Sequence, residues 1–153
     1  MAFFKTIPTD IISRMEDSIR TLLKGYGLSI TDSRREVLQL FYNNNGAMAH
    51  ADIEKQAGNK MDRVTIYRTL QTFEERGIIH SIPSADNVVR YALCKEQCAD
   101  GHHHDNHVHF LCNACGKTSC LENVIVPKVK LPLGFLPSES NMVVKGICNL
   151  CRA

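Results

Sequence analysis

The chain has 153 residues, a formal net charge of +2 and a hydrophobic content of 44%. This length suits one average domain or two small ones, and the composition is that of a globular protein. Its apolar runs are too short to cross a membrane, and the N-terminus lacks the long apolar stretch of a signal peptide. We therefore expect a cytoplasmic protein without a membrane partner, in which seven cysteines serve metal or redox chemistry. Any nucleic-acid binding must come from a local basic patch.

Cysteine and histidine divide the chain into two parts. Residues 1–93 contain no cysteine and two histidines, whereas residues 94–153 contain all seven cysteines and five histidines. We take this shift as a domain boundary, with one domain at 1–93 and a second at 94–153.

The first part begins with two predicted helices. Apolar residues recur at helical spacing from Ile12 to Leu23, and the run stops at Gly25-Tyr26-Gly27. A second helix is expected to start at Thr31 or Asp32, because both side chains can accept hydrogen bonds from the free amides of a first turn. Its inner face is expected to hold Val37, Leu38 and Phe41.

Two further helices and a hairpin complete the first part. A short helix is predicted over 51–57, and another runs from a cap at Asp62 to Gly77, a residue suited to a helix C-terminus. Strands at 78–82 and 88–93 follow, joined by a turn. Three helices after a leading one, followed by a hairpin, is the order of a winged helix.

The second part is predicted to contain strands and few helical segments. The strand-like segments are 107–112, 118–121 and 141–146. Three prolines between them, Pro127, Pro132 and Pro137, make a long helix there unfavourable, because proline breaks helical hydrogen bonding.

The predicted helix after Asp62 carries polar, cationic and aromatic groups that are able to contact DNA. These are Arg63, Thr65, Tyr67 and Arg68. The second helix of a helix-turn-helix lies in the major groove, where arginine reaches guanine edges or phosphates and tyrosine packs on thymine methyls or binds phosphate. Composition alone fits a solvated helix face equally well. Three nearby cations, Arg34, Arg35 and Lys60, favour double-stranded DNA.

Two Cys-x-x-Cys pairs, Cys112/Cys115 and Cys148/Cys151, lie in the second part. Four thiolates at this spacing can hold one tetrahedral Zn²⁺, and a domain this small needs more than its core to be stable. We predict a structural Zn(Cys)4 site. An Fe–S cluster uses the same ligands, and unliganded thiols or a redox pair are the alternatives.

The segment Val64–Leu70 (VTIYRTL) resembles the recognition-helix signature of the ferric uptake regulator (Fur) family. The same order of parts follows it: a wing ending in Tyr91-Ala92-Leu93, a histidine-rich run, the segment 109–117 (HFLCNACGK) and a terminal Cys-x-x-Cys. The resemblance extends over nearly the whole chain. It implies an α+β protein, with an N-terminal winged-helix DNA-binding domain and a small α/β dimerisation domain. It also implies a homodimeric, metal-activated repressor that binds operator DNA and controls metal uptake genes.

A sensor also needs a metal that can leave. Candidate ligands for it are His80, Cys94, His107, His109 and Cys120. His107 and His109 alternate along one predicted strand, so both can face the same side. A site drawing on both domains would fix their relative orientation when filled. Alternatively, His80 is a surface histidine of the wing, and the two cysteines are small buried apolar residues.

The resemblance implies which candidates act. In the zinc-sensing (Zur) branch, a wing histidine, a cysteine after the wing and a histidine before the first Cys-x-x-Cys form the regulatory site. His80, Cys94, and His107 or His109 match these places. Cys120 stands where the family carries a carboxylate as fourth ligand. Thiolates favour Zn²⁺ over Fe²⁺ or Mn²⁺, so we predict a repressor in which zinc is both the structural and the regulatory metal.

Elsewhere the chain departs from the family. Ala47 stands where iron sensors carry a histidine at the start of the third helix. A further interdomain site is also dismantled, with Asn106, Val108, Pro127 and Ser140 at its positions. The run His102–His104 or Cys98 could rebuild a site.

Three rival functions remain at this point. The same scaffold could sense Fe²⁺, Mn²⁺ or peroxide. A thiol-redox or zinc enzyme would need an open coordination position and a general base, but acidic residues near the motif are sparse. A zinc-buffering protein would leave Arg63–Arg68 without a purpose. We therefore predict no enzymatic activity and no small-molecule substrate.

Overall fold

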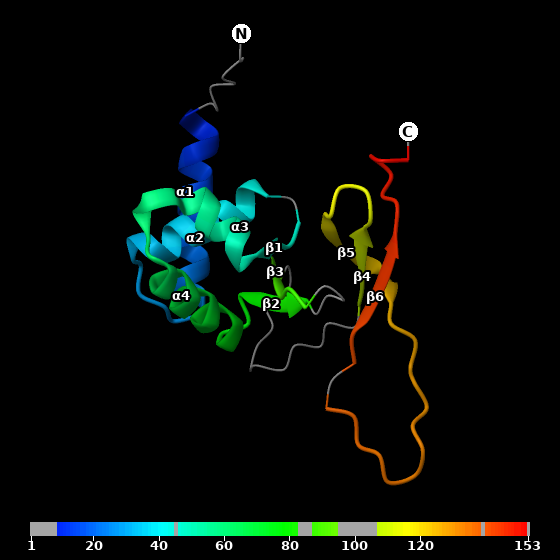
Figure 1. Ribbon diagram of the computed structural model, residues 1–153. Coiled ribbons are helices and arrows are strands. Elements are labelled where there is room, and N and C mark those ends of the chain that lie inside the picture. The colour runs from blue at the N-terminus through cyan, green and yellow to red at the C-terminus, as the bar shows by residue number, and fades with distance from the viewer. Residues whose placement is uncertain (1–8, 45, 83–86, 95–106, 139, 153) are drawn as a thin grey trace.

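The computed structural model describes residues 9–44, 46–82, 87–94, 107–138 and 140–152. In chain order the elements are α1 (Thr9–Gly25), α2 (Asp32–Asn43), β1 (Met48–Ala49), α3 (His50–Ala57), the 3-10 turn η1 (Gly58–Lys60), α4 (Arg63–Glu75), β2 (Ile79–Ile82), β3 (Arg90–Leu93), β4 (His107–Cys112), β5 (Thr118–Ile125) and β6 (Met142–Gly146). The helices gather on one side and β4–β6 on the other, with β2 and β3 between them (Figure 1). The predicted α+β class is confirmed. No helix in the described ranges is long and apolar enough to cross a membrane.

The helix ends follow from local chemistry. Thr31 caps α2, and Asp62 caps α4 by accepting a hydrogen bond from the amide of Thr65 at 2.7 Å. Just beyond α4, Gly77 has φ +74°, a left-handed conformation that glycine adopts without steric cost. These three residues are the predicted boundaries, so short-range signals fix where α4 begins and ends.

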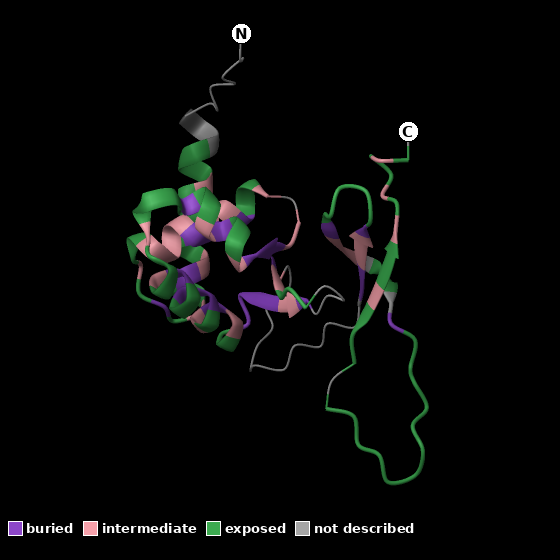
Figure 2. Cartoon of the chain, in the orientation of Figure 1, coloured by how far each residue is buried: buried purple, intermediate pink, exposed green. Residues whose placement is uncertain are grey.

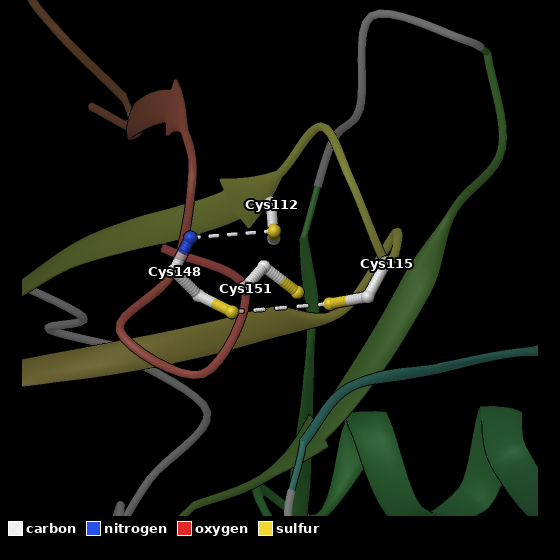
Figure 3. A group of neighbouring side chains, drawn as sticks. All are labelled: Cys112, Cys115, Cys148 and Cys151. Carbon is white, nitrogen blue, oxygen red and sulfur yellow. Dashed lines mark hydrogen bonds between the residues drawn. The ribbon is translucent and has the colours of Figure 1, made fainter. Parts of the chain in front are cut away.

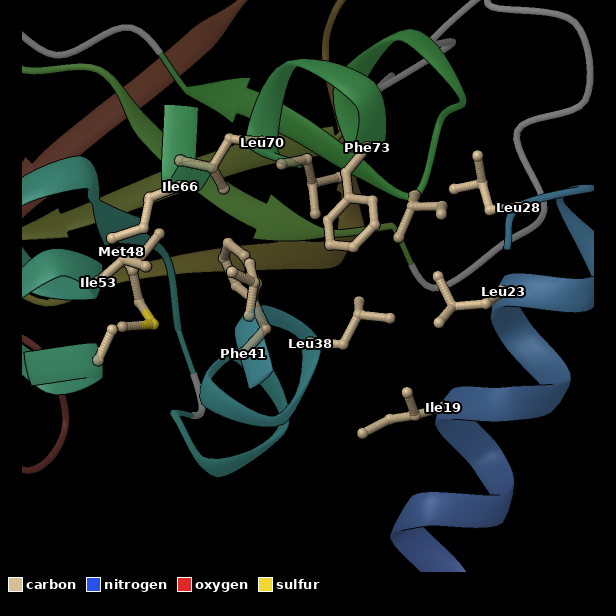
Figure 4. Packing of buried hydrophobic residues seen from close by; sticks show 14 residues of the cluster. Ile19, Leu23, Leu28, Leu38, Phe41, Met48, Ile53, Ile66, Leu70 and Phe73 are labelled. Atoms are coloured by element: carbon tan, nitrogen blue, oxygen red, sulfur yellow. The ribbon is translucent and has the colours of Figure 1, made fainter. Parts of the chain in front are cut away.

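The helices share one apolar core with β1 and β2 (Figure 4). Each helix contributes buried side chains to it, among them Leu23, Leu38, Ile53, Ile66 and Phe73. Burying one such side chain stabilises a fold by roughly 1.5–3 kcal/mol. Figure 2 shows buried residues concentrated inside this helical part. The apolar face of α4 therefore packs against the core, and its opposite face is exposed to solvent.

Strands β1, β3 and β2 form the wing sheet, an antiparallel sheet in the order β1-β3-β2. His80 of β2 pairs with Ala92 of β3, and the amide of Cys94 donates to the carbonyl of Ile78 at 3.0 Å. Cys94 therefore lies close to His80. Strand β1 was not predicted, because two residues are too few to show alternating hydrophobicity.

Strands β5, β4 and β6 form the C-terminal sheet, in the order β5-β4-β6. β4 is antiparallel to β5 and parallel to β6. β5 extends to Ile125, beyond the predicted end at Leu121. The resemblance implied a mixed α/β domain, but within the described parts of 107–152 the regular elements are all strands. The proline-rich segment after β5 runs out as a long loop without helix (Figure 1). The boundary at residue 93 stays a prediction.

Candidate functional site

The four cysteines of the two Cys-x-x-Cys pairs converge at one end of the C-terminal sheet (Figure 3). Their sulfur atoms all lie within 4.8 Å of one another. Parallel pairing of β4 with β6 sets Cys112 opposite Gly146, so the turns that follow the two strands lie side by side. We call Cys112, Cys115, Cys148 and Cys151 the four-cysteine cluster. Its donor set suggests structural zinc.

Hydrogen bonding within this cluster separates its thiols in acidity. The backbone N–H groups of Cys115 and Cys148 point at the Cys112 sulfur and lower the pKa of this thiol to about 6. The Cys151 thiol has its pKa raised to about 12, because it donates toward the sulfurs of Cys148 and Cys115. The site thus holds a preformed thiolate beside a proton that a bound metal would displace.

A second group of metal-binding side chains joins the two sheets. His80 from β2 places its Nε2 3.2 Å from Nε2 of His109 and 3.8 Å from Sγ of Cys120. All three donor atoms lie within 4.8 Å of one another. His109 and Cys120 are direct partners across β4 and β5, so their side chains project from the same face. We call His80, His109 and Cys120 the His80 cluster.

Cys94 lies on the other side of the His80 ring. Its Sγ is 3.4 Å from Nδ1 of His80, whereas Nε2 faces His109 and Cys120. Cys94 and Cys120 therefore face different nitrogens, and one ion bound at Nε2 is not within equal reach of both thiols. A four-ligand arrangement requires the imidazole to turn or Cys94 to move. His107 begins β4, but its side chain lies outside the described residues.

The solvent face of α4 carries most of the side chains predicted to read DNA. Arg63, Tyr67 and Arg68 are exposed, and Tyr67 keeps 59% of its surface in solvent. Thr65 differs, because its hydroxyl donates to Asp62 at 3.0 Å and helps to form the helix start. These hydrogen bonds from Thr65, led by its backbone amide, lower the pKa of Asp62.

Sequence reasoning missed Val64 as a member of this face. Its side chain is 57% exposed and lies three residues before Tyr67, one helical turn away. An exposed β-branched residue beside two arginines offers an apolar contact for a thymine methyl. The available signal was its position off the i, i+4 apolar stripe of Ile66 and Leu70.

The neighbouring cations expected to add positive charge are tied to local partners. Lys60 forms an ion pair with Glu36, and Nη1 of Arg34 donates to the backbone carbonyl of Ser29 at 2.8 Å. Arg35 lies 3.7 Å from Asp32. These three cations lie in the helical part, and their interactions with local partners leave less of their charge available to DNA.

The remaining candidates divide between the described and undescribed parts. His50 begins α3, and its Nδ1 lies 3.8 Å from Oε2 of Glu54. Cys98 and the run His102–His104 lie outside the described residues.

Comparison with known proteins connects these features. A model of the ferric uptake regulator family matches residues 25–131. The ferric uptake regulation protein of Staphylococcus aureus (strain Mu50 / ATCC 700699) is 31% identical over 144 residues, covering 89% of this chain and 96% of that protein.

Two solved structures extend the comparison to the fold. A zinc uptake regulator complexed with zinc and DNA gives a TM-score of 0.65 at 20% identity, covering 95% of this chain and 97% of that one. The Vibrio cholerae ferric uptake regulator gives 0.57 at 19% identity, covering 84% and 98%. At these identities the likeness is one of fold.

Proposed function

The chain belongs to the ferric uptake regulator family, and from that premise we propose that it is a transcriptional repressor whose DNA binding is switched on by zinc. Membership makes it a metal-responsive, DNA-binding regulator of transcription rather than an enzyme. The choice of zinc, the ligand roles and the repressor action are our proposal, and each follows from the chemistry of particular side chains.

The His80 cluster carries the proposal for zinc. It combines two imidazoles with the thiol of Cys120, and a further thiol, Cys94, contacts the same histidine. Iron(II) and manganese(II) prefer nitrogen and oxygen donors, whereas thiolates favour zinc among the metals such a sensor meets. The curated relatives carry ferric names, so the sulfur donors, and not the names, support this assignment.

The position of the cluster suggests how a metal would act. His80 belongs to the wing sheet, and His109 and Cys120 belong to the C-terminal sheet. A bound zinc would supply one cross-link between these sheets. His80 would then hold the wing, and α4 packed behind it, in one orientation. Fixing that orientation raises DNA affinity, because the competent arrangement no longer has to be selected from many.

The four-cysteine cluster has a different proposed role. Cys112 ends β4, and the other three ligands lie in the segments that follow β4 and β6 at the same end of a single sheet, so a metal there does not bridge the two sheets. We assign it a structural zinc that holds the turn after β4 to the turn after β6.

Homodimerisation is also part of the proposal. The C-terminal part exposes large apolar side chains in its long loop: Val129 (67%), Leu133 (104%), Phe135 (66%) and Leu136 (95%). Several large apolar side chains exposed on one loop are consistent with an interaction surface. A second copy of the chain that covers this surface would give a dimer with two α4 helices, which could enter successive major grooves of operator DNA. We place this dimer in the cytoplasm.

One titration tests the function. A DNA duplex is first selected from random sequences with the zinc-loaded protein. The affinity of the protein for this duplex is then measured as a function of free Zn²⁺, Fe²⁺ or Mn²⁺, at fixed salt and without oxygen. We expect zinc to raise affinity at the lowest free concentration. A stronger response to iron or manganese would assign the chain to those sensors, and equal affinity without metal would remove the switch.

A further inference from the structure

The helical part and the C-terminal sheet also meet away from the His80 cluster. The amide of Ala47, in the loop between α2 and β1, donates to the backbone carbonyl of Thr118 at 3.1 Å. Next to it, a Cβ built on Gly46 would lie 2.9 Å from that same oxygen and 3.1 Å from Cε of Lys117. The two backbones therefore approach so closely that even one methyl group does not fit.

The need for glycine at this position is spatial. A side chain at this position is opposed by the carbonyl oxygen of Thr118, which belongs to the backbone and cannot swing aside as a flexible side chain can. The loop is also held in place from behind, because Nδ2 of Asn44 donates to the carbonyl of Leu40 and to Oε1 of Gln56, both at 2.9 Å. A loop anchored on α2 and α3 thus presses a glycine against the first residue of β5.

This contact is well placed to affect both metal sites. Ala47 leads directly into β1 of the wing sheet, while Lys117 accepts a hydrogen bond from the amide of Cys112 at 3.0 Å. Cys120 lies two residues beyond Thr118 on β5. A cavity of about 710 Å³ is lined both by Gly46 of this contact and by Cys120 of the His80 cluster. Among the described residues, this backbone contact and the His80 cluster are thus two places where the helical part meets the C-terminal sheet.

We propose that the backbone contact of Gly46 and Ala47 with Lys117 and Thr118 is a second, metal-free attachment, and that Gly46 is a positioning residue for the metal response. The inference rests on the proposed function, since it assigns the contact to that response. One attachment leaves the helical part free to swing about it, whereas two restrict it. When the backbone contact is already formed, the helical part samples fewer orientations, and His80 stays near His109 and Cys120. Metal binding then shifts the population further toward the conformer in which these three ligands are together.

Gly46→Ala tests this, with Gly25→Ala as the matched control. Gly25 ends α1, has ordinary φ, and has nothing within 4 Å of its built Cβ. We expect Gly46→Ala to keep its zinc content and melting temperature but to lose about tenfold or more of the affinity gained on adding zinc, a size usual for coupling between sites. Gly25→Ala should respond like the parent. An undiminished zinc response in Gly46→Ala would overturn the proposal.

A double variant identifies the atom responsible. The Lys117 side chain can swing away, but the Thr118 carbonyl cannot move without displacing β5. Gly46→Ala/Lys117→Ala should therefore remain as impaired as Gly46→Ala. Full recovery in the double variant would place the clash on the lysine side chain and would overturn the backbone contact.

Hydrogen exchange of the Ala47 amide reports on the contact in the absence of DNA. In the full-length zinc-loaded protein the Ala47 amide should exchange slowly, and Gly46→Ala should accelerate it while Gly25→Ala does not. Fast exchange in the parent protein would refute the contact. If the parent shows no zinc-dependent DNA binding, the proposed function fails, and exchange at Ala47 still decides whether the attachment exists.

Discussion

The two groups of metal-binding side chains differ in the number of sheets that supply their residues. The four-cysteine cluster draws on the end of β4 and on the short segments that follow β4 and β6, two neighbouring strands of one sheet. The His80 cluster draws on three strands of two sheets. A metal in the first closes a unit already built, whereas a metal in the second restricts how two units sit. The difference suggests why one chain carries both, since a metal that stays and a metal that signals need different attachments.

Removing a ligand from the four-cysteine cluster should have the largest effect. Cys112→Ser or Cys148→Ser is expected to lose the tightly bound zinc together with the folded C-terminal sheet. Structural zinc contributes roughly 10 kcal/mol or more to folding in comparable small units. Metal analysis, thermal melting and sedimentation measure this. A variant that loses one zinc but keeps its cooperative melt and its dimer would show that the cluster is not structural.

Changing Cys120 should separate the two clusters. Cys120→Ser is expected to keep the structural zinc and the fold but to lose zinc-dependent DNA binding, because a neutral hydroxyl is a poor substitute for a thiolate. Cys120→Asp should recover part of the zinc response and gain some response to Mn²⁺ or Fe²⁺. Titrations with each metal measure both.

The control for Cys120 is Cys94, which contacts the other ring nitrogen of His80. Because Cys94 contacts Nδ1 of His80, away from the other donors, Cys94→Ser should weaken the zinc response less than Cys120→Ser does. Should Cys120→Asp unfold the protein while Cys120→Ser still responds to zinc, Cys120 is a buried apolar residue and not a ligand, since an unpaired buried carboxylate is costly.

Variants on α4 should leave both clusters intact. Arg68→Ala and Tyr67→Ala are each expected to weaken duplex binding by about 1–3 kcal/mol while zinc content stays unchanged. Lys24→Ala, which removes an exposed cation from α1, is the matched control. A loss that is equal for all DNA sequences and flattens the salt dependence would indicate phosphate contacts instead of base contacts. Unchanged affinity in both variants would place α4 outside the groove.

The smallest effect concerns protons. Above pH 6 the metal-free Cys112 is already a thiolate, because its pKa is lowered to about 6, whereas Cys151, with its pKa raised to about 12, still holds a proton. Zinc uptake at the four-cysteine cluster should therefore release a proton from Cys151 throughout the neutral range. Release per zinc should rise by up to about one as pH falls through 6, where Cys112 becomes protonated. Calorimetry in buffers of different ionisation enthalpy measures the number, and a constant release across pH 6 would contradict the assignment.

Local signals predicted much of the fold. The helix caps at Thr31 and Asp62 and the glycine after α4 lie where side-chain chemistry and backbone freedom required them. Strand β1 escaped prediction because its two residues are strands only through pairing with β3. The full length of β5 likewise depends on its partner β4.

The metal sites show the same limit. The spacing of the four cysteines was enough to group them, because each pair is local. Which ring nitrogen of His80 faces Cys94 depends on how two sheets pack and on a side-chain rotation, neither of which leaves a trace in the sequence. Gly46 carries no signal either, because the carbonyl oxygen it approaches belongs to a strand in the other part of the chain.

The pairing of His109 with Cys120 also constrains how the gene can diverge. The turn from Cys112 to Lys117 sets which residue of β5 lies opposite His109, and the same turn carries half of the four-cysteine cluster. Inserting one residue in it would bring Ser119 opposite His109 and turn the thiol of Cys120 to the other face of the sheet. Substitutions can alter the metal preference one ligand at a time, but insertions and deletions between the two clusters would disable both at once.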